Sequence, residues 1–125
     1  MKAATGAFVS ILLILTAGAA HAQSAEGGER TFNQQCRTCH RAEKDVASPV
    51  GPSLYGVIGR KAGSLAGYEF SDAMKKSGIT WDEASLADYL KDPKAKVPGG
   101  KMVFAGLKRP AQVDDVIAYL KKAAQ

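Results

Sequence analysis

The stretch CRTCH, residues 36–40, decides how the rest of this sequence is interpreted. Cys36 and Cys39 lie three positions apart, so both thiols can face one group from a single helical turn, and His40 follows directly. The pattern C-x-x-C-H is the attachment signature of c-type haem, in which the thiols bond the two porphyrin vinyl groups and the histidine presents its imidazole to the iron. We expect one haem c per chain, attached through Cys36 and Cys39.

Other uses of this cysteine pair fit the sequence less well. A structural zinc site needs four ligands, and residues 23–125 offer only the two cysteines and His40. A thioredoxin-like redox pair needs a βαβ context, of which there is no sign. A simple disulfide between the cysteines stays open, but it leaves His40 without a role.

The first 22 residues resemble a cleavable secretory signal peptide. Lys2 supplies a positive charge, residues 8–15 (FVSILLIL) form an apolar run, and Ala20 and Ala22 frame a small-x-small cleavage site. The run is too short to span a bilayer, although an uncleaved anchor is the alternative. We expect signal peptide 1–22 to be removed, leaving a domain of residues 23–125 in the periplasm without stable membrane insertion.

Helical patterns dominate this domain, and no segment alternates as a strand would. Gly27 and Gly28 open a helix that runs into the CRTCH stretch. Ser71 can cap a short helix over residues 72–77. Thr80 and Glu83 form a capping-box pattern for a helix that stops at residues 92–93, Asp-Pro.

The clearest helix begins at Pro110. Its apolar residues follow the spacing i, i+3, i+4, i+7, and they are Val113, Val116, Ile117 and Leu120. Residues 45–67 are rich in Gly, Pro and Ser and indicate loops. We expect a small all-α domain of three to five short helices with long loops. Such helices make a thin core, so something besides side chains should fill the centre.

The second axial ligand of the expected haem is left open by the residues themselves. His40 is the only histidine in residues 23–125, so the ligand must be methionine, lysine, a small molecule or nothing. Met74 and Met102 are the internal methionines. Methionine–histidine ligation raises the reduction potential and gives an electron carrier, whereas an open position suggests a peroxidase or a gas-binding domain.

Charge favours an acidic partner. The formal net charge of +5 falls by one with loss of Lys2, and an exported basic protein meets acidic proteins more readily than nucleic acid. No acidic residue interrupts the cations between positions 94 and 109. These candidate docking residues are Lys94, Lys96, Lys101, Lys108 and Arg109. An ordinary solvated scatter of charge is the alternative.

The sequence resembles the small class I cytochromes c, especially the soluble bacterial cytochromes c2 and the mitochondrial-type members. The resemblance spans essentially all of residues 23–125. Beyond Phe32 and CRTCH, it includes GPSLYGVIGRKAG (51–63), GITW (78–81), YLKDPK (89–94), PGGKMVFAG (98–106) and IAYLKK (117–122). It implies the class I cytochrome c fold over residues 23–125, with short helices and long loops wrapped around one covalently bound haem.

The resemblance also implies the roles of individual residues. His40 and Met102 become the axial ligands. The Pro52 carbonyl should accept a hydrogen bond from His40, and the Tyr89 hydroxyl should point to the Met102 sulfur. The other expected haem contacts are Arg60 and Trp81 at a buried propionate and Phe104 beside the exposed edge. Gly28 and Phe32 should cross against Val116 and Tyr119.

Four positions depart from the family pattern. Phe70 stands where many relatives have tyrosine, Gly100 where threonine is usual, and Met74 where asparagine is common. Ser48 replaces a histidine that often ties two loops together. Fewer polar partners near the haem predict a drier distal pocket and a heavier electrostatic role for Arg60.

The function implied by the resemblance is that of a soluble, monomeric one-electron carrier and not an enzyme. Its expected donor is a bc-type quinol oxidoreductase, and its acceptor a terminal oxidase, a photosynthetic reaction centre or a peroxidase, in respiration or photosynthesis. A haem peroxidase or gas-binding sensor with a labile Met102 is the alternative. A disulfide-stapled exported binding domain is the third interpretation.

Overall fold

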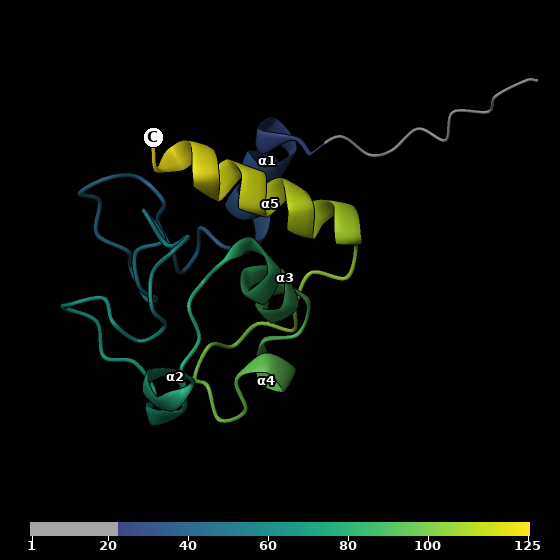
Figure 1. Cartoon of the computed structure of the whole chain (residues 1–125). Helices are drawn as coiled ribbons and strands as arrows, with labels where there is room; N and C mark the ends of the chain where they lie inside the picture. Colours follow the sequence, from purple (N-terminus) through teal and green to yellow (C-terminus); the bar gives the residue numbers. More distant parts are fainter. Residues whose placement is uncertain (1–22) are drawn as a thin grey trace, which may run out of the picture.

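A computed structural model describes residues 23–125, and these form five helices joined by long loops (Figure 1). The helices are α1 (Ala25–Gln35), α2 (Asp72–Lys76), α3 (Glu83–Lys91), α4 (Pro93–Lys96) and α5 (Pro110–Ala123). Within the described residues, β-type pairing is limited to one isolated bridge between Lys61 and Thr80. The expected all-α architecture is confirmed, while the signal peptide predicted for residues 1–22 lies outside the described part.

Helices α1 and α5 cross and pack against each other, as expected (Figure 1). Phe32 of α1 is fully buried, and its ring centroid lies 5.2 Å from that of Tyr119. A Cβ atom on Gly28 would overlap the backbone carbonyl of Asp115, so only glycine allows the helices to approach this closely. The crossing joins the two ends of the domain.

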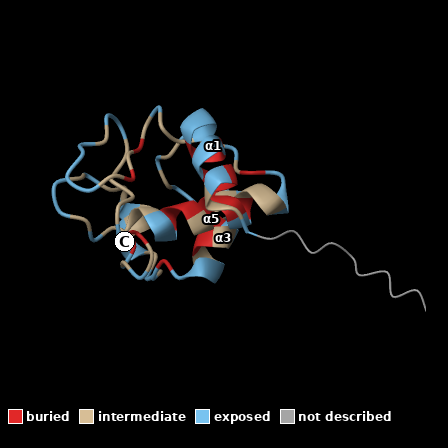
Figure 2. Ribbon diagram, turned by 90° about the horizontal axis from the view of Figure 1, so that it is seen from above, coloured by how far each residue is buried: buried red, intermediate tan, exposed pale blue. Residues whose placement is uncertain are grey.

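The buried residues gather on the facing sides of α1, α3 and α5 (Figure 2). The apolar stripe predicted on α5 is confirmed, since Val113, Val116, Ile117 and Leu120 are all buried. Leu86 of α3 joins the same core. The long loop over residues 40–70 lies mostly to one side of these helices (Figure 1), and its buried residues Ala42, Val57 and Ala62 join the same core.

Two expected helix starts were wrong. Helix α1 begins at Ala25 instead of Gly27, because Ser24 caps it by accepting the Gly27 N–H at 3.0 Å. The capping box expected at Thr80 is absent: Asp82 is the N-cap of α3 and accepts the Ser85 N–H at 2.7 Å. Thr80 instead pairs with Lys61.

The stop expected at Asp92 and Pro93 is a break between two helices. Asp92 ends α3 and also caps α4, accepting the Ala95 N–H at 3.1 Å. Pro93 occupies the first position of α4, where its missing N–H costs nothing. In the part of the chain that the structure describes, every helix is too short or too polar to cross a bilayer.

Candidate functional site

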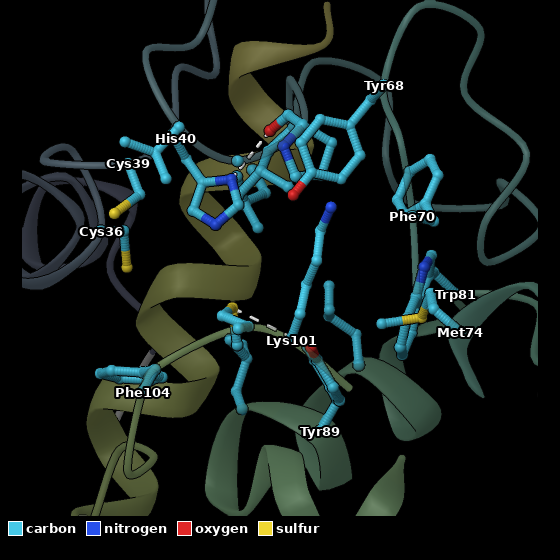
Figure 3. Close-up of a pocket in the computed structure, with 18 of the residues that line it drawn as sticks. Cys36, Cys39, His40, Tyr68, Phe70, Met74, Trp81, Tyr89, Lys101 and Phe104 are labelled. Carbon is cyan, nitrogen blue, oxygen red and sulfur yellow. Dashed lines mark hydrogen bonds between the residues drawn. The ribbon is translucent and has the colours of Figure 1, made fainter. Parts of the chain in front are cut away.

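A cavity of about 270 Å³ lies between the helices and the wrapped loops (Figure 3). Its wall is mostly apolar and comes from widely separated stretches of the chain. All nine residues predicted to contact a haem line it: Cys36, Cys39, His40, Pro52, Arg60, Trp81, Tyr89, Met102 and Phe104. The structure therefore brings the whole predicted set to one place.

The CRTCH stretch continues from the end of α1 as a tight turn. The Cys36 N–H donates to the Phe32 carbonyl at 2.8 Å, and the His40 N–H donates to the Cys36 carbonyl at 2.9 Å. Cys36 and Cys39 are free thiols, and both line the pocket beside the imidazole (Figure 3). Burial, assisted by neighbouring Cys39, raises the pKa of Cys36 to about 11, so its thiol is neutral at pH 7.

His40 is held in the orientation and charge state of a metal ligand. Its Nδ1 lies 2.8 Å from the Pro52 carbonyl oxygen. Because a carbonyl only accepts, Nδ1 carries the proton and leaves the Nε2 lone pair for the pocket. Burial lowers the pKa of His40, and the contact with Pro52 offsets only part of this. The ring is therefore favoured in its neutral form.

Gly51 is a site residue to which sequence reasoning gave no role. A Cβ atom at this position would overlap the His40 imidazole. The sequence offered one signal for this role: Gly51 directly precedes Pro52 in the stretch 51–63 that resembles the family. Tyr68 also lines the pocket without having been predicted, packing its ring edge-on against Phe70 with centroids 4.7 Å apart.

Met102 lies half-buried in the glycine-rich loop after α4. The Tyr89 hydroxyl donates toward its sulfur at 3.9 Å, which is the contact expected from the resemblance (Figure 3). Burial raises the pKa of Tyr89 to about 12, so this hydroxyl keeps its proton. Tyr89 in turn packs on Trp81, with ring centroids 4.9 Å apart. By contrast, Val103 is 99% exposed.

Arg60 and two of the four departures from the family pattern, Phe70 and Met74, also line this pocket. The Arg60 guanidinium donates to the carbonyls of Ser53 at 2.8 Å and Tyr55 at 3.2 Å. Burial lowers its pKa. Phe70 and Met74 line the pocket, as a drier wall requires. The heavier electrostatic role expected for Arg60 stays a prediction.

Ser48, the remaining departure with a side chain, makes a contact within its own loop. Its hydroxyl oxygen accepts the Arg41 N–H at 2.8 Å.

The predicted docking cations differ in how strongly the chain itself engages them. Lys96 pairs with Asp88 at 3.2 Å. The Lys101 ammonium lies 4.7 Å from the centre of the Tyr68 ring and donates to the Glu69 carbonyl. Lys108 donates to a backbone carbonyl in its own loop. Lys94 and Arg109 are exposed.

The chemistry of these side chains fits a covalently bound haem c. Two thiols, a neutral imidazole and a thioether line one apolar pocket. Residues 23–125 contain no group of three or more His, Cys, Asp or Glu that could hold a metal ion by themselves. A bound haem would supply the other metal ligands from its own macrocycle.

Comparison with known proteins supports this chemistry. The family model of Cytochrome c matches residues 25–124. The chain is similar to cytochrome c2 of Rhodomicrobium vannielii, with 50% identity over 120 residues, 96% of this chain and 95% of the relative. It is 63% identical to cytochrome c2 iso-2 of Magnetospirillum fulvum over 86 residues, 69% of this chain and 88% of the relative. Among solved structures, cytochrome cH from Methylobacterium extorquens is 56% identical with a TM-score of 0.73, covering 79% of this chain and 98% of its own.

Proposed function

The chain belongs to the class I c-type cytochromes, in the cytochrome c2 family, and from this premise we propose that it carries single electrons through a haem c ligated by His40 and Met102. When bound, haem c supplies a reversible one-electron couple whose potential is set by its ligands, burial and hydrogen bonds. Cys36 and Cys39 would attach it covalently. The chain's own part is to hold both ligands and exclude water.

One observation carries this proposal: both candidate ligands line one pocket, and a neighbouring group restrains each of them. Pro52 fixes Nδ1 of His40, so that Nε2 is the free nitrogen. Tyr89 approaches the Met102 sulfur. Because His40 and Met102 would both bind the iron, a bound haem would offer a substrate no open position and would supply electron transfer alone.

Carbon monoxide binding tests the proposal. The reduced haem-loaded protein should not bind carbon monoxide at neutral pH, because Met102 would occupy the iron position that carbon monoxide needs. Met102→Ala should bind it readily while keeping its covalent haem. Ready binding by the unsubstituted protein would contradict the carrier function and favour the peroxidase or gas-binding alternative.

The proposed partners are acidic redox proteins. A bc-type quinol oxidoreductase would reduce the chain, and a terminal oxidase, reaction centre or peroxidase would oxidise it. The docking surface proposed for both is the cation group Lys94, Lys96, Lys101, Lys108 and Arg109. Attraction between opposite charges weakens with salt, so transfer rates should fall as ionic strength rises. Rates that stay flat would contradict this surface.

We also propose a periplasmic location reached by removal of residues 1–22. The apolar run and the alanine-framed site before Gln23 support this. The mass of the exported protein tests it, since cleavage leaves Gln23 as the first residue. Retention of the first 22 residues on a membrane-bound protein would favour the uncleaved anchor.

A further inference from the structure

Arg37 makes two side-chain contacts that brace the CRTCH turn. Its Nε donates to the Asn33 side-chain oxygen at 2.6 Å, which ties the turn to the last residues of α1. Its Nη2 donates to Glu43 on the far side of the turn, and Glu43 also accepts the Ala42 N–H at 3.1 Å. Beside Arg37, the pKa of Glu43 is lowered. The turn is therefore bridged from its entry to its exit.

Arg41 braces the same turn from within. Its guanidinium Nη1 donates to the Arg37 carbonyl and, at 2.9 Å, to the His40 carbonyl. Its backbone N–H donates to the Ser48 hydroxyl at 2.8 Å. Two carbonyls beyond the end of α1 thereby gain partners, and the backbone on either side of Cys39 is fixed.

These hydrogen bonds are all local in sequence, although Arg37 also interacts with Tyr119 of α5. The partners are separated by four, six, four, one and seven positions. Closing such short loops costs little chain entropy, so the network can form before the long-range core contacts exist. In contrast, the α1–α5 crossing joins opposite ends of the domain.

We propose that Arg37 and Arg41 are positioning residues for covalent haem attachment, holding Cys36 and Cys39 where both thiols reach the two vinyl groups of one porphyrin. In each addition one S–C bond forms, the vinyl double bond becomes single, and the thiol hydrogen moves to the other vinyl carbon. The reaction is redox-neutral and releases nothing. This role rests on the haem c of the proposed function but not on any redox partner.

The network should affect attachment more than the stability of the finished protein. The side chains of Arg37 and Glu43 are 33% and 42% exposed, and an ion pair this exposed contributes little to stability. Once two thioether bonds fix the cysteines, the turn no longer depends on the arginines. Before attachment, the arginines add to the backbone hydrogen bonds that hold both thiols in one geometry.

The test uses the full chain with reduced thiols, mixed anaerobically with ferrous protohaem, and follows the two-thioether product by intact mass. Arg37→Ala and Arg41→Ala should each lower the initial rate by about two- to fivefold, the factor expected for a weak contact. Arg37→Lys should recover part of it, because it keeps the charge facing Glu43. Arg30→Ala, which removes an exposed arginine on the outer part of α1, is the matched control.

Each outcome decides the question. Slower attachment in the Arg37 and Arg41 variants, with unfolding midpoints of the finished proteins equal to that of the Arg30 control, supports the role. Unchanged rates, or an equal loss in the Arg30 control, overturn it. Failure of the unsubstituted chain to form any thioether overturns the proposed cofactor attachment itself, and this role with it.

Discussion

The proximal segment (residues 36–52) and the distal loop (residues 97–106) offer their ligand atoms to one pocket by different means. His40 is fixed by a 2.8 Å contact to Pro52 within its own segment. Met102 lies on a loop with Gly99 and Gly106 at positive φ, and its sulfur lies 3.9 Å from the hydroxyl of Tyr89 on another element. One proposed ligand, His40, is held by a short local contact, and the other, Met102, is approached by a weaker contact from another element.

The proximal segment is therefore the rigid side of the site, and the distal loop is the side that can open. A neutral imidazole with its second nitrogen tied is a strong, oriented ligand. A thioether held by one long contact is easier to displace, so ligand exchange should begin at Met102. Changes in the proximal segment should therefore damage the site itself, while changes in the distal loop should tune it.

The largest expected effect is that of Gly51→Ala in the proximal segment. The new Cβ overlaps the His40 ring, and such overpacking costs about 1–3 kcal/mol of unfolding free energy. Denaturant unfolding and the visible spectrum of the haem-loaded protein should both change. The matched control is Gly56→Ala, which lies at a φ of +66° in open space. It should cost about 1 kcal/mol by backbone strain and leave the spectrum unchanged. Equal spectra for both variants would contradict the close packing under His40.

A smaller effect is expected for Tyr89→Phe on the distal side. The substitution removes the hydroxyl near the Met102 sulfur, and a neutral hydrogen bond contributes about 0.5–1.5 kcal/mol. Imidazole added to the oxidised protein should then displace Met102 more readily, with a dissociation constant lower by roughly two- to tenfold. Tyr68→Phe, which alters another hydroxyl at the same pocket, should leave that constant unchanged. Equal dissociation constants for Tyr89→Phe and the unsubstituted protein would show that the Tyr89 hydroxyl does not help to hold Met102.

Sequence reasoning found what is local or repetitive. CRTCH is a contiguous motif, and the α5 stripe has a period that packing preserves. It missed the start of α3, because the pairing of Thr80 with Lys61 is a contact between distant positions. It also missed Gly51, whose role depends on a ring that folds over it.

For the proposed docking cations, the sequence likewise failed to reveal contacts with residues outside their own stretch. The sequence shows no acid between positions 94 and 109, yet Asp88 reaches Lys96 from the preceding helix. Lys101 similarly meets Tyr68 and Glu69 from a loop 32 residues earlier. Neither partner is evident from the spacing of the cations alone.

Acid should weaken the proximal segment through Glu43. Its pKa is lowered chiefly by the hydrogen bond from Arg37, so its contribution to stability is complete above the unfolded pKa of about 4.3 and is lost as pH falls through the lower folded value. Glu43→Gln should make the free energy of unfolding depend less on pH below about pH 5. The change should be less than about 1 kcal/mol, because the pair is exposed. Adding Glu43→Gln to Arg37→Ala should change the profile much less. An unaltered profile in the single variant would contradict the pairing.

The smallest expected effect separates two of the proposed docking lysines near the distal loop, Lys94 and Lys96. Lys94 is exposed, whereas the Lys96 ammonium already faces Asp88 at 3.2 Å. A charge that is partly neutralised by its own chain contributes less to the field that guides an acidic partner. Lys94→Gln should therefore reduce the second-order rate of electron transfer at low salt by roughly twofold, and Lys96→Gln by less. Both differences should vanish at high ionic strength, where surface charges are screened. Stopped-flow kinetics with an acidic redox protein measure this order, and a larger loss for Lys96→Gln would show that Asp88 does not limit that lysine.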